Sequence, residues 1–144
     1  MVAIRIACTT DIPALVNLCE QLGYPTTALE ILGRVKDLNS LDDHLLLVAE
    51  TDSGQVVGWV HGSIRKLLVI APHIELGELV VDESQRGQGI GEQLLHAVEA
   101  WASDQGIKTV LVRSNAIRVD AHRFYQRLGY ENVKTSLTFI KKCD

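Results

Sequence analysis

The sequence predicts an α+β fold formed by a single domain over residues 1–144. Segments rich in β-branched and alternating apolar residues are interspersed with segments whose apolar residues recur at helical spacing. A βαβ unit from 74 to 113 stands out, because its two predicted strands flank a long amphipathic helix. A length of 144 residues fits one domain, and 47% apolar with 22% charged residues is the composition of a globular protein. No repeat, low-complexity tract or linker divides the chain.

The first third of the chain predicts a strand followed by two helices. The strand is Val2–Ile6. Thr10-Asp11 then forms a predicted helix cap, and apolar residues follow at helical spacing as far as Leu22. Gly23-Tyr24-Pro25 ends this helix, and a second helix is predicted from Thr27 to about Leu38.

The middle of the chain predicts a group of strands. His44–Glu50 and Gln55–His61 are β-rich runs on either side of a turn signal, which predicts a hairpin. Another strand is expected to follow as far as about Ile70. Ala71-Pro72-His73 ends it, and Ile74–Asp82 is the next predicted strand.

The last part predicts helices and strands in alternation. An amphipathic helix begins at Ile90 and ends at Gly106, and a strand follows at Lys108–Arg113. A helix at Ala121–Leu128 precedes a last strand, Val133–Ile140. The predicted element order is therefore β-α-α-β-β-β-α-β-α-β.

Composition argues against several classes of protein. The net charge of −4 disfavours non-specific binding to nucleic acid. The longest purely apolar runs have five residues, far fewer than the ~20 that span a bilayer, so no membrane segment is expected. The three cysteines and five histidines are scattered, which predicts reduced thiols in a cytoplasmic protein and no metal site.

Charge is unevenly distributed along the chain. Residues 1–112 carry 7 basic and 15 acidic side chains, whereas residues 113–144 carry 7 basic and 3 acidic side chains. The asymmetry is compatible with a basic end for an anionic ligand and an acidic end for a cationic one. Ordinary surface composition accounts for it equally well.

A glycine-rich loop between a strand and a helix carries the most specific signal. Gly87, Gly89 and Gly91 lie in this loop and at the start of the amphipathic helix. Glycine allows a tight turn and a close approach of a ligand to the backbone. The helix start also offers unpaired N–H groups and the positive end of the helix dipole, and Arg86 adds a cation. The sequence therefore predicts a phosphate or pyrophosphate site here.

Two common phosphate motifs do not match this loop. The dinucleotide fingerprint requires a third glycine where this chain has Glu92, and it usually lies in the first βαβ unit of a fold. The nucleotide P-loop pattern, Gly-x-x-x-x-Gly-Lys-Ser/Thr, does not occur.

The order Arg86-x-x-Gly89-x-Gly91, after an apolar strand and at the start of a helix, resembles the acyl-coenzyme A loop of the GNAT superfamily of N-acetyltransferases. Leu79-Val80-Val81-Asp82 is similar to that family's fourth strand, and residues 121–130 are similar to its closing helix and turn. The resemblance implies the acyl-CoA N-acyltransferase (GNAT) fold, a central mixed, mostly antiparallel sheet flanked by helices. It also implies acetyl-CoA (coenzyme A) as cosubstrate and transfer of the acetyl group to an amine.

The resemblance further implies which residues hold the cosubstrate. The pyrophosphate is expected on backbone N–H groups of Arg86, Gly87, Gln88, Gly89, Ile90 and Gly91. The thioester is expected along Leu79, Val80 and Val81, with the Val81 amide facing its carbonyl oxygen. Asn115 and Arg118 are further candidates for a coenzyme contact, and Arg118 stands where the family frequently has asparagine.

Two side chains are candidates for proton transfer. Tyr125 occupies the position of the family's tyrosine general acid, which protonates the leaving thiolate. Glu78 is the favoured base for the acceptor ammonium, and Glu75 is expected on the opposite face of a regular strand. A bulge in the strand would change the faces on which the two glutamates lie. Transfer of the proton through water is a further alternative to a carboxylate base.

The acceptor amine is not identified by the sequence: a small molecule and a peptide both fit. A homodimer is common in the family, and no sequence feature marks an interface. Neither nucleic acid nor a membrane is expected as a partner. A non-catalytic acyl-CoA-binding protein that acts through protein contacts is the alternative function, and a different phosphate-dependent enzyme is the third.

Overall fold

A computed structural model describes the whole chain, residues 1–144, as two compact units. The first unit is Met1–Arg113 and the second is Ser114–Asp144. Each unit is described by itself, and the expectation of a single domain stays a prediction.

The first unit contains a five-stranded sheet. In chain order, which is also the order across the sheet, the strands are β1 (Val2–Ile6), β2 (His44–Thr51), β3 (Val56–Arg65), β4 (His73–Val81) and β5 (Val110–Val112). Neighbouring strands are antiparallel except β4 and β5, which are parallel. The predicted mixed, mostly antiparallel sheet is confirmed.

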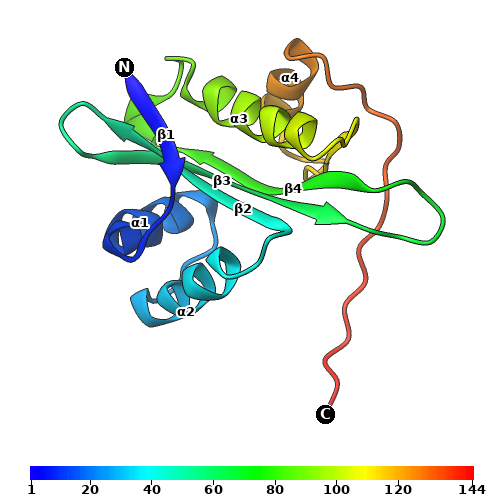
Figure 1. The fold of residues 1–144 in the computed structure, drawn as a ribbon, viewed down its shortest axis with the longest axis horizontal. Coiled ribbons are helices and arrows are strands. Elements are labelled where there is room, and N and C mark those ends of the chain that lie inside the picture. The colour runs from blue at the N-terminus through cyan, green and yellow to red at the C-terminus, as the bar shows by residue number, and fades with distance from the viewer. The chain divides into compact units, whose positions relative to one another are not determined.

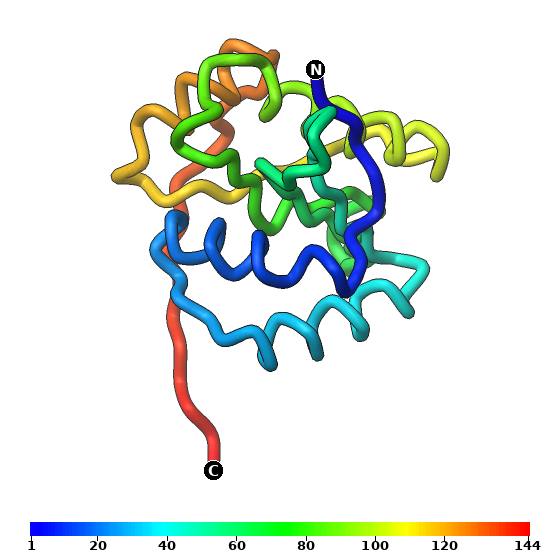
Figure 2. Tube along the Cα trace, turned by 90° about the vertical axis from the view of Figure 1, so that its left-hand side faces the viewer, coloured from blue at the N-terminus to red at the C-terminus, as the bar shows by residue number.

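Helices cover both faces of this sheet. α1 (Ile12–Leu22) and α2 (Ala28–Asn39) lie side by side on one face, and α3 (Ile90–Asp104) lies on the other (Figures 1 and 2). Short 3-10 turns at Thr9–Asp11 and Glu83–Gln85 precede α1 and the glycine-rich loop.

Local signals account for where the helices begin. Pro13 lies in the first turn of α1, where no intrahelical N–H bond is lost. Thr27 caps α2: its Oγ1 accepts a hydrogen bond from the Glu30 N–H, and Glu30 Oε1 accepts one from the Thr27 N–H. This capping box satisfies two N–H groups that the helix itself leaves unpaired.

Each face of the sheet has its own apolar core. On the face covered by α1 and α2, the buried side chains come from these two helices and from β2, β3 and β4. They include Leu15, Leu18, Cys19, Ile31, Val35, Leu46, Val48, Trp59 and Val80. On the other face, α3 contributes Leu94, Leu95 and Val98, which are fully buried. Gly58 of β3 makes room for α3, because a Cβ there would lie 2.9 Å from Val80 O and 3.2 Å from the Leu94 side chain.

The second unit contains one helix, α4 (Val119–Arg127). Tyr125 in this helix packs edge-to-face against Phe124 and Tyr130, with ring centroids 5.2 and 5.8 Å apart. The Tyr130 N–H donates to Tyr125 O at 3.0 Å, which closes the turn after the helix. These contacts hold the tyrosine ring in one orientation within its unit.

The last predicted strand is wrong. Residues 133–140 form no strand, and their large apolar side chains, Val133, Leu137, Phe139 and Ile140, are 80% to 88% exposed. An alternating apolar pattern produces a strand only where the backbone finds a partner strand, and this segment pairs with none.

The strand expected to reach Ile70 is also wrong in its extent. One continuous strand, β3, covers the two predicted segments and ends at Arg65. Because Arg65 pairs with His73, residues 66–72 form the connection between β3 and β4, and the apolar run Leu67–Ile70 is exposed.

Candidate active site

Strand β4 has an open edge along its second half. β5 pairs with β4 only at Ile74–Leu76, whereas β4 continues to Val81. On the opposite edge, the N–H of Asp82, the residue after β4, donates to Val57 O of β3 at 2.8 Å. N–H directions alternate along a strand, so the N–H groups of Leu79 and Val81 point away from β3, toward the open edge. By the same alternation Val80, the third residue predicted to hold the thioester, directs its N–H to β3.

The glycine-rich loop leads from β4 into α3. Gly87 and Gly89 have φ angles of +80° and +81°, a left-handed conformation that disfavours other residues. Gly89 is the N-cap of α3 and supplies no side-chain cap. The first hydrogen bond within the helix runs from the Gln93 N–H to Gly89 O, so the N–H groups of Ile90 and Gly91 have no acceptor inside it. The predicted anion site is therefore an uncapped helix start.

Arg86 ties this loop to the end of β4. Its Nε donates to Val81 O at 3.2 Å. In the preceding turn, Asp82 Oδ1 accepts from the Ser84 N–H and Oγ at 3.0 and 2.9 Å. These bonds from Ser84, with a smaller contribution from the positive charge of Arg86, hold the pKa of Asp82 below its usual range. The turn thus contains a fixed carboxylate whose charge Arg86 offsets.

A bulge in β4 changes the faces on which its glutamates lie. The register with β3 shifts at Gly77, which has no partner residue. His61 pairs with Glu78, and Ser63 pairs with Glu75. His61 and Ser63 are two residues apart and share a face of β3, and cross-strand partners share a face of the sheet. Glu75 and Glu78 therefore lie on the same face, and the expectation of opposite faces is wrong.

The two glutamates differ in their surroundings. Arg113 Nε donates to Glu75 Oε1 at 2.5 Å, and Arg65 Nη1 lies 3.5 Å from Glu75 Oε2. Glu78 faces the helices: burial raises the pKa of the Cys19 thiol of α1, and the negative charge of Glu78 adds to that rise. Two guanidinium groups thus engage Glu75, and Glu78 is the carboxylate turned toward α1.

A pair of stacked histidines lies on the same face, and sequence reasoning missed it. His44 Nδ1 of β2 and His61 Nε2 of β3 are 2.9 Å apart, and the ring centroids are 5.2 Å apart with planes inclined by 15°. Burial and, to a lesser degree, the neighbouring His44 hold the pKa of His61 below its usual range. The two residues are 17 positions apart, so only the register between the strands reveals the pair.

The second unit holds the other predicted residues. Asn115 organises the turn before α4: its Oδ1 accepts from the Ile117 N–H at 3.2 Å, and its carbonyl oxygen contacts His122 Nε2 at 2.8 Å. Arg118 is the N-cap of α4 and makes no side-chain capping bond. Tyr125, Asn115 and Arg118 thus belong to one local structure around α4.

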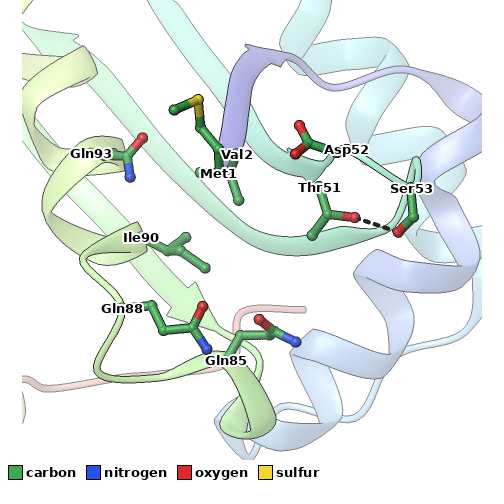
Figure 3. Close-up of a pocket in the computed structure, with 9 residues that line it drawn as sticks. All are labelled: Met1, Val2, Thr51, Asp52, Ser53, Gln85, Gln88, Ile90 and Gln93. Carbon is green, nitrogen blue, oxygen red and sulfur yellow. Dashed lines mark hydrogen bonds between the residues drawn. The ribbon is translucent and has the colours of Figure 1, made fainter.

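A polar hollow of about 300 Å³ adjoins the loop (Figure 3). It lies between the start of α3 and the turn that joins β2 to β3, and Gln88 and Ile90 of the loop line it together with Thr51 and Ser53. No lysine or arginine lines the hollow, so it lacks the side-chain cations that a pyrophosphate favours.

Three further observations concern metal ligands, membrane helices and cysteines. No group of three or more His, Cys, Asp or Glu side chains is placed to hold a metal ion. No helix combines the length and the apolar character that crossing a membrane requires. The three cysteines, Cys8, Cys19 and Cys143, are free thiols.

Similarity to solved acetyltransferase structures places the five-stranded mixed sheet and its covering helices in the class of the acyl-CoA N-acyltransferase fold. The acetyltransferase (GNAT) family matches residues 10–130 of the chain. The chain belongs to this family.

Several named relatives are similar in sequence. An aminoalkylphosphonate N-acetyltransferase of Salmonella typhimurium is 39% identical over 94 residues, which are 65% of this chain and 61% of that relative. An aminoglycoside N(6')-acetyltransferase type 1 of the same organism is 26% identical over 70% of this chain and 72% of its own length. An L-methionine sulfoximine/L-methionine sulfone acetyltransferase of Pseudomonas aeruginosa is 29% identical over 90% of this chain and 80% of its own.

Solved structures share the fold. AAC(6')-Iy in complex with the bisubstrate analogue CoA-S-monomethyl-acetylneamine has a TM-score of 0.87 at 23% identity, and the match covers 99% of both chains. The aminoglycoside 6'-N-acetyltransferase AAC(6')-Ih from Acinetobacter baumannii has a TM-score of 0.87 at 23% identity over 100% of both chains.

Proposed function

We propose that this protein is an N-acetyltransferase that transfers an acetyl group from acetyl-CoA to a primary amine by direct attack. Membership of the family supports the reaction class, and the named relatives are acetyltransferases. The observation that carries the proposal is the open edge of β4 at Leu79 and Val81, which leads to the uncapped start of α3. This path offers N–H groups to a thioester at one end and to a pyrophosphate at the other.

The proposal gives each group a role. Backbone N–H groups of residues 86–91 bind the pyrophosphate, and Asn115 and Arg118 are further coenzyme contacts. The Val81 amide polarises the thioester carbonyl as negative charge develops on its oxygen. Tyr125 acts as the general acid that protonates the leaving thiolate. Glu78 is the carboxylate that faces the ammonium group of the acceptor.

A small cationic amine is the acceptor that we favour. The relatives named above are described as enzymes acting on aminoalkylphosphonates and aminoglycosides, which are amines of this size. The excess of acidic side chains in residues 1–112 is suited to attracting an ammonium group. A peptide amine is the competing acceptor class and belongs in the same experiment.

The test is a turnover screen that follows thiol release from acetyl-CoA with aminoalkylphosphonates, aminoglycosides and peptides. The Tyr125→Phe variant is expected to lose about 10²- to 10⁴-fold in turnover, because the thiolate then has no positioned acid. Its affinity for acetyl-CoA should stay the same. A smaller loss would make solvent the proton source.

Acetyl-CoA binding is measured separately by thermal unfolding. A ligand at 100 times its dissociation constant stabilises the folded protein by about 2.7 kcal/mol. Gly89→Trp should remove that stabilisation, because a bulky side chain blocks the approach to the helix start and Gly89 has φ of +81°. Binding without turnover on any amine would favour the non-catalytic alternative, and stabilisation by ATP or NAD instead of coenzyme A would favour a different phosphate-dependent enzyme.

The proposal includes a homodimer in the cytoplasm. The exposed apolar side chains at Val133, Leu137, Phe139 and Ile140 support contact with a second copy, since large apolar patches rarely face water in a monomer. The free thiols of Cys8, Cys19 and Cys143 are suited to a reducing compartment. Light scattering of the purified protein tests the assembly, and a monomeric mass would contradict it.

A further inference from the structure

The histidine pair of β2 and β3 offers a path for a proton. His61 has two ring nitrogens with different neighbours. A Cβ on Gly77 would lie 3.1 Å from His61 Nδ1, so this nitrogen faces the bulge of β4. The other nitrogen, Nε2, is 2.9 Å from His44 Nδ1. A proton that enters at the bulge therefore meets a second imidazole directly behind the first.

The path continues from His44 toward solvent. His44 Nε2 lies 3.9 Å from Asp43 Oδ1, and the two side chains are 25% and 59% exposed. Three groups thus lead outward in the order His61, His44 and Asp43. An imidazole with an ordinary pKa of about 6.5 both accepts and releases a proton near neutral pH, which suits it to this task.

The charged and titratable groups around His61 come from several elements. His44 stacks on it from β2, and Glu78 is its cross-strand partner in β4. Next to Glu78 on this face, the Cys19 thiol of α1 interacts with the charges of Glu78 and of Arg34 of α2, although burial is the main cause of its raised pKa. Burial also dominates the lowered pKa of His61, so its ring is neutral and able to accept a proton at neutral pH.

The bulge lies where an attacking amine would arrive, an argument that rests on the proposed function. With its pyrophosphate at residues 86–91, the cosubstrate runs back along the open edge of β4 toward Gly77, next to the three residues at which β5 closes that edge. The geometry points to His61, with His44 behind it, as the group that takes the proton from the acceptor ammonium, while Glu78 attracts that ammonium into place.

The protons and electrons of this step balance. The ammonium gives one proton to His61 Nδ1 and becomes an amine with a free electron pair. That pair forms the N–C bond, the C–S bond breaks, and its electrons leave on sulfur. His61 passes its Nε2 proton to His44, which releases one from Nε2 to Asp43 or water. The amide nitrogen loses one further proton and the thiolate gains one, so the products are the amide, the thiol and one proton.

The experiment compares His61→Gln, His44→Gln and Glu78→Gln by their pH profiles, with the amine that gives the highest rate in the turnover screen. His61→Gln should lower kcat at pH 7 by about 10²- to 10⁴-fold and abolish the acidic limb of kcat/KM. His44→Gln should keep that limb and move it to higher pH, because His44 helps to lower the pKa of His61. Glu78→Gln should mainly raise KM for a cationic amine.

His96→Gln is the matched control, because this histidine lies on α3, is 57% exposed and has Glu92 and Glu99 of the same helix within 4.0 Å. Thermal unfolding with and without acetyl-CoA verifies that each variant folds and binds. An acidic limb retained in His61→Gln would overturn the inference and leave the proposed function intact. No turnover by the unmodified protein on any amine would overturn the proposed function and this inference with it.

Discussion

The two faces of the sheet differ in how far apolar packing extends along them. On the α3 face, fully buried Leu94 and Val98 lie against Gly58 and Gly62 of β3, and a Cβ on Gly62 would be 3.4 Å from the Val98 side chain. On the α1/α2 face, the apolar core reaches Trp59, and His61, two residues further along β3, begins a polar region with Glu75 and Glu78. One face is thus closed by packing, and the other is apolar only at one end.

This difference shows how one sheet serves both stability and chemistry. The bulge at Gly77 interrupts the regular alternation of side chains along β4, so this strand supplies Leu76 to the closed face and Glu78 to the polar one. Close packing on the α3 side holds the strands in place. The polar groups on the other side can then keep fixed distances without contributing to the core.

The helices are also attached differently. α3 is held through its leucines and valine. α1 begins beside an ion pair, in which Arg5 Nη1 and Nη2 each donate to a carboxylate oxygen of Asp11 at 2.8 Å, and Asp11 is only 5% exposed. The next two predictions separate these two kinds of attachment.

Leu94→Ala should give the largest loss of stability. Leu94 is 0% exposed and packs toward Gly58, so truncation leaves a cavity that the surrounding strands fill only partly. The expected cost is about 2–5 kcal/mol in the free energy of unfolding, measured by urea denaturation. A matched truncation on the other face, Leu46→Ala, should cost a similar amount because Leu46 is 7% exposed. If Leu94→Ala cost less than 1 kcal/mol while Leu46→Ala cost the expected amount, the α3 face would not be closed by packing as described.

Asp11→Asn should cost about 2 kcal/mol at neutral pH, because charge-assisted hydrogen bonds to Arg5 are lost. The hydrogen bond from Arg5 is the main reason that the pKa of Asp11 lies below its usual range. The ion pair therefore contributes fully above the unfolded pKa of about 3.9, and its contribution is lost as pH falls through the lower folded value.

The difference in unfolding free energy between the parent protein and Asp11→Asn should accordingly stay constant from pH 7 to pH 5 and shrink below pH 4. Denaturation curves at several pH values measure it. Other carboxylates act equally in both proteins, so the difference isolates Asp11. A difference that grows on acidification would contradict the assignment.

Much of this architecture follows from local sequence signals. The amphipathic spacing of α3, the start of α2 at Thr27 and the glycine-rich loop all depend on contiguous residues, and each was found where the sequence predicts it. Whether an apolar segment forms a strand depends on more distant parts of the chain. Val133–Ile140 has the apolar residues of a strand and no partner, whereas β5, with three residues, is a strand because β4 pairs with it.

The polar face shows why site geometry was harder to predict. A one-residue shift at Gly77 moves Glu78 to the same face as Glu75, and no residue type in the sequence predicts that shift. The stacked histidines meet only because β2 and β3 pair in one particular register. The glycine-rich loop was predictable because its signal is contiguous in the sequence. The groups beside the bulge were not, because their proximity depends on the pairing of three strands.

Gly77→Ala tests the bulge itself, with a smaller effect on stability of about 1 kcal/mol. The added Cβ would lie 3.1 Å from His61 Nδ1, so the ring must move by a few tenths of an ångström. Activity should fall more than stability suggests, since the displaced nitrogen is the one that we propose takes the proton from the acceptor. Turnover and thermal unfolding of the same preparation measure the two effects. Gly33→Ala in α2, where a Cβ meets nothing within 4 Å, is the control: it should leave turnover unchanged and raise stability by about 0.5–1 kcal/mol, because alanine favours a helix interior over glycine.

Glu75→Gln should give the smallest effect and sharpens the contrast between the two glutamates. Its partners Arg65 and Arg113 are 49% and 56% exposed, and ion pairs with exposed partners contribute about 0–1 kcal/mol. Turnover at saturating amine should hardly change, because Arg65 and Arg113 engage this carboxylate rather than an acceptor. Glu78→Gln, on the same face and the same strand, should instead raise KM. Equal kinetic effects of the two substitutions would contradict the assignment of different roles to the two carboxylates.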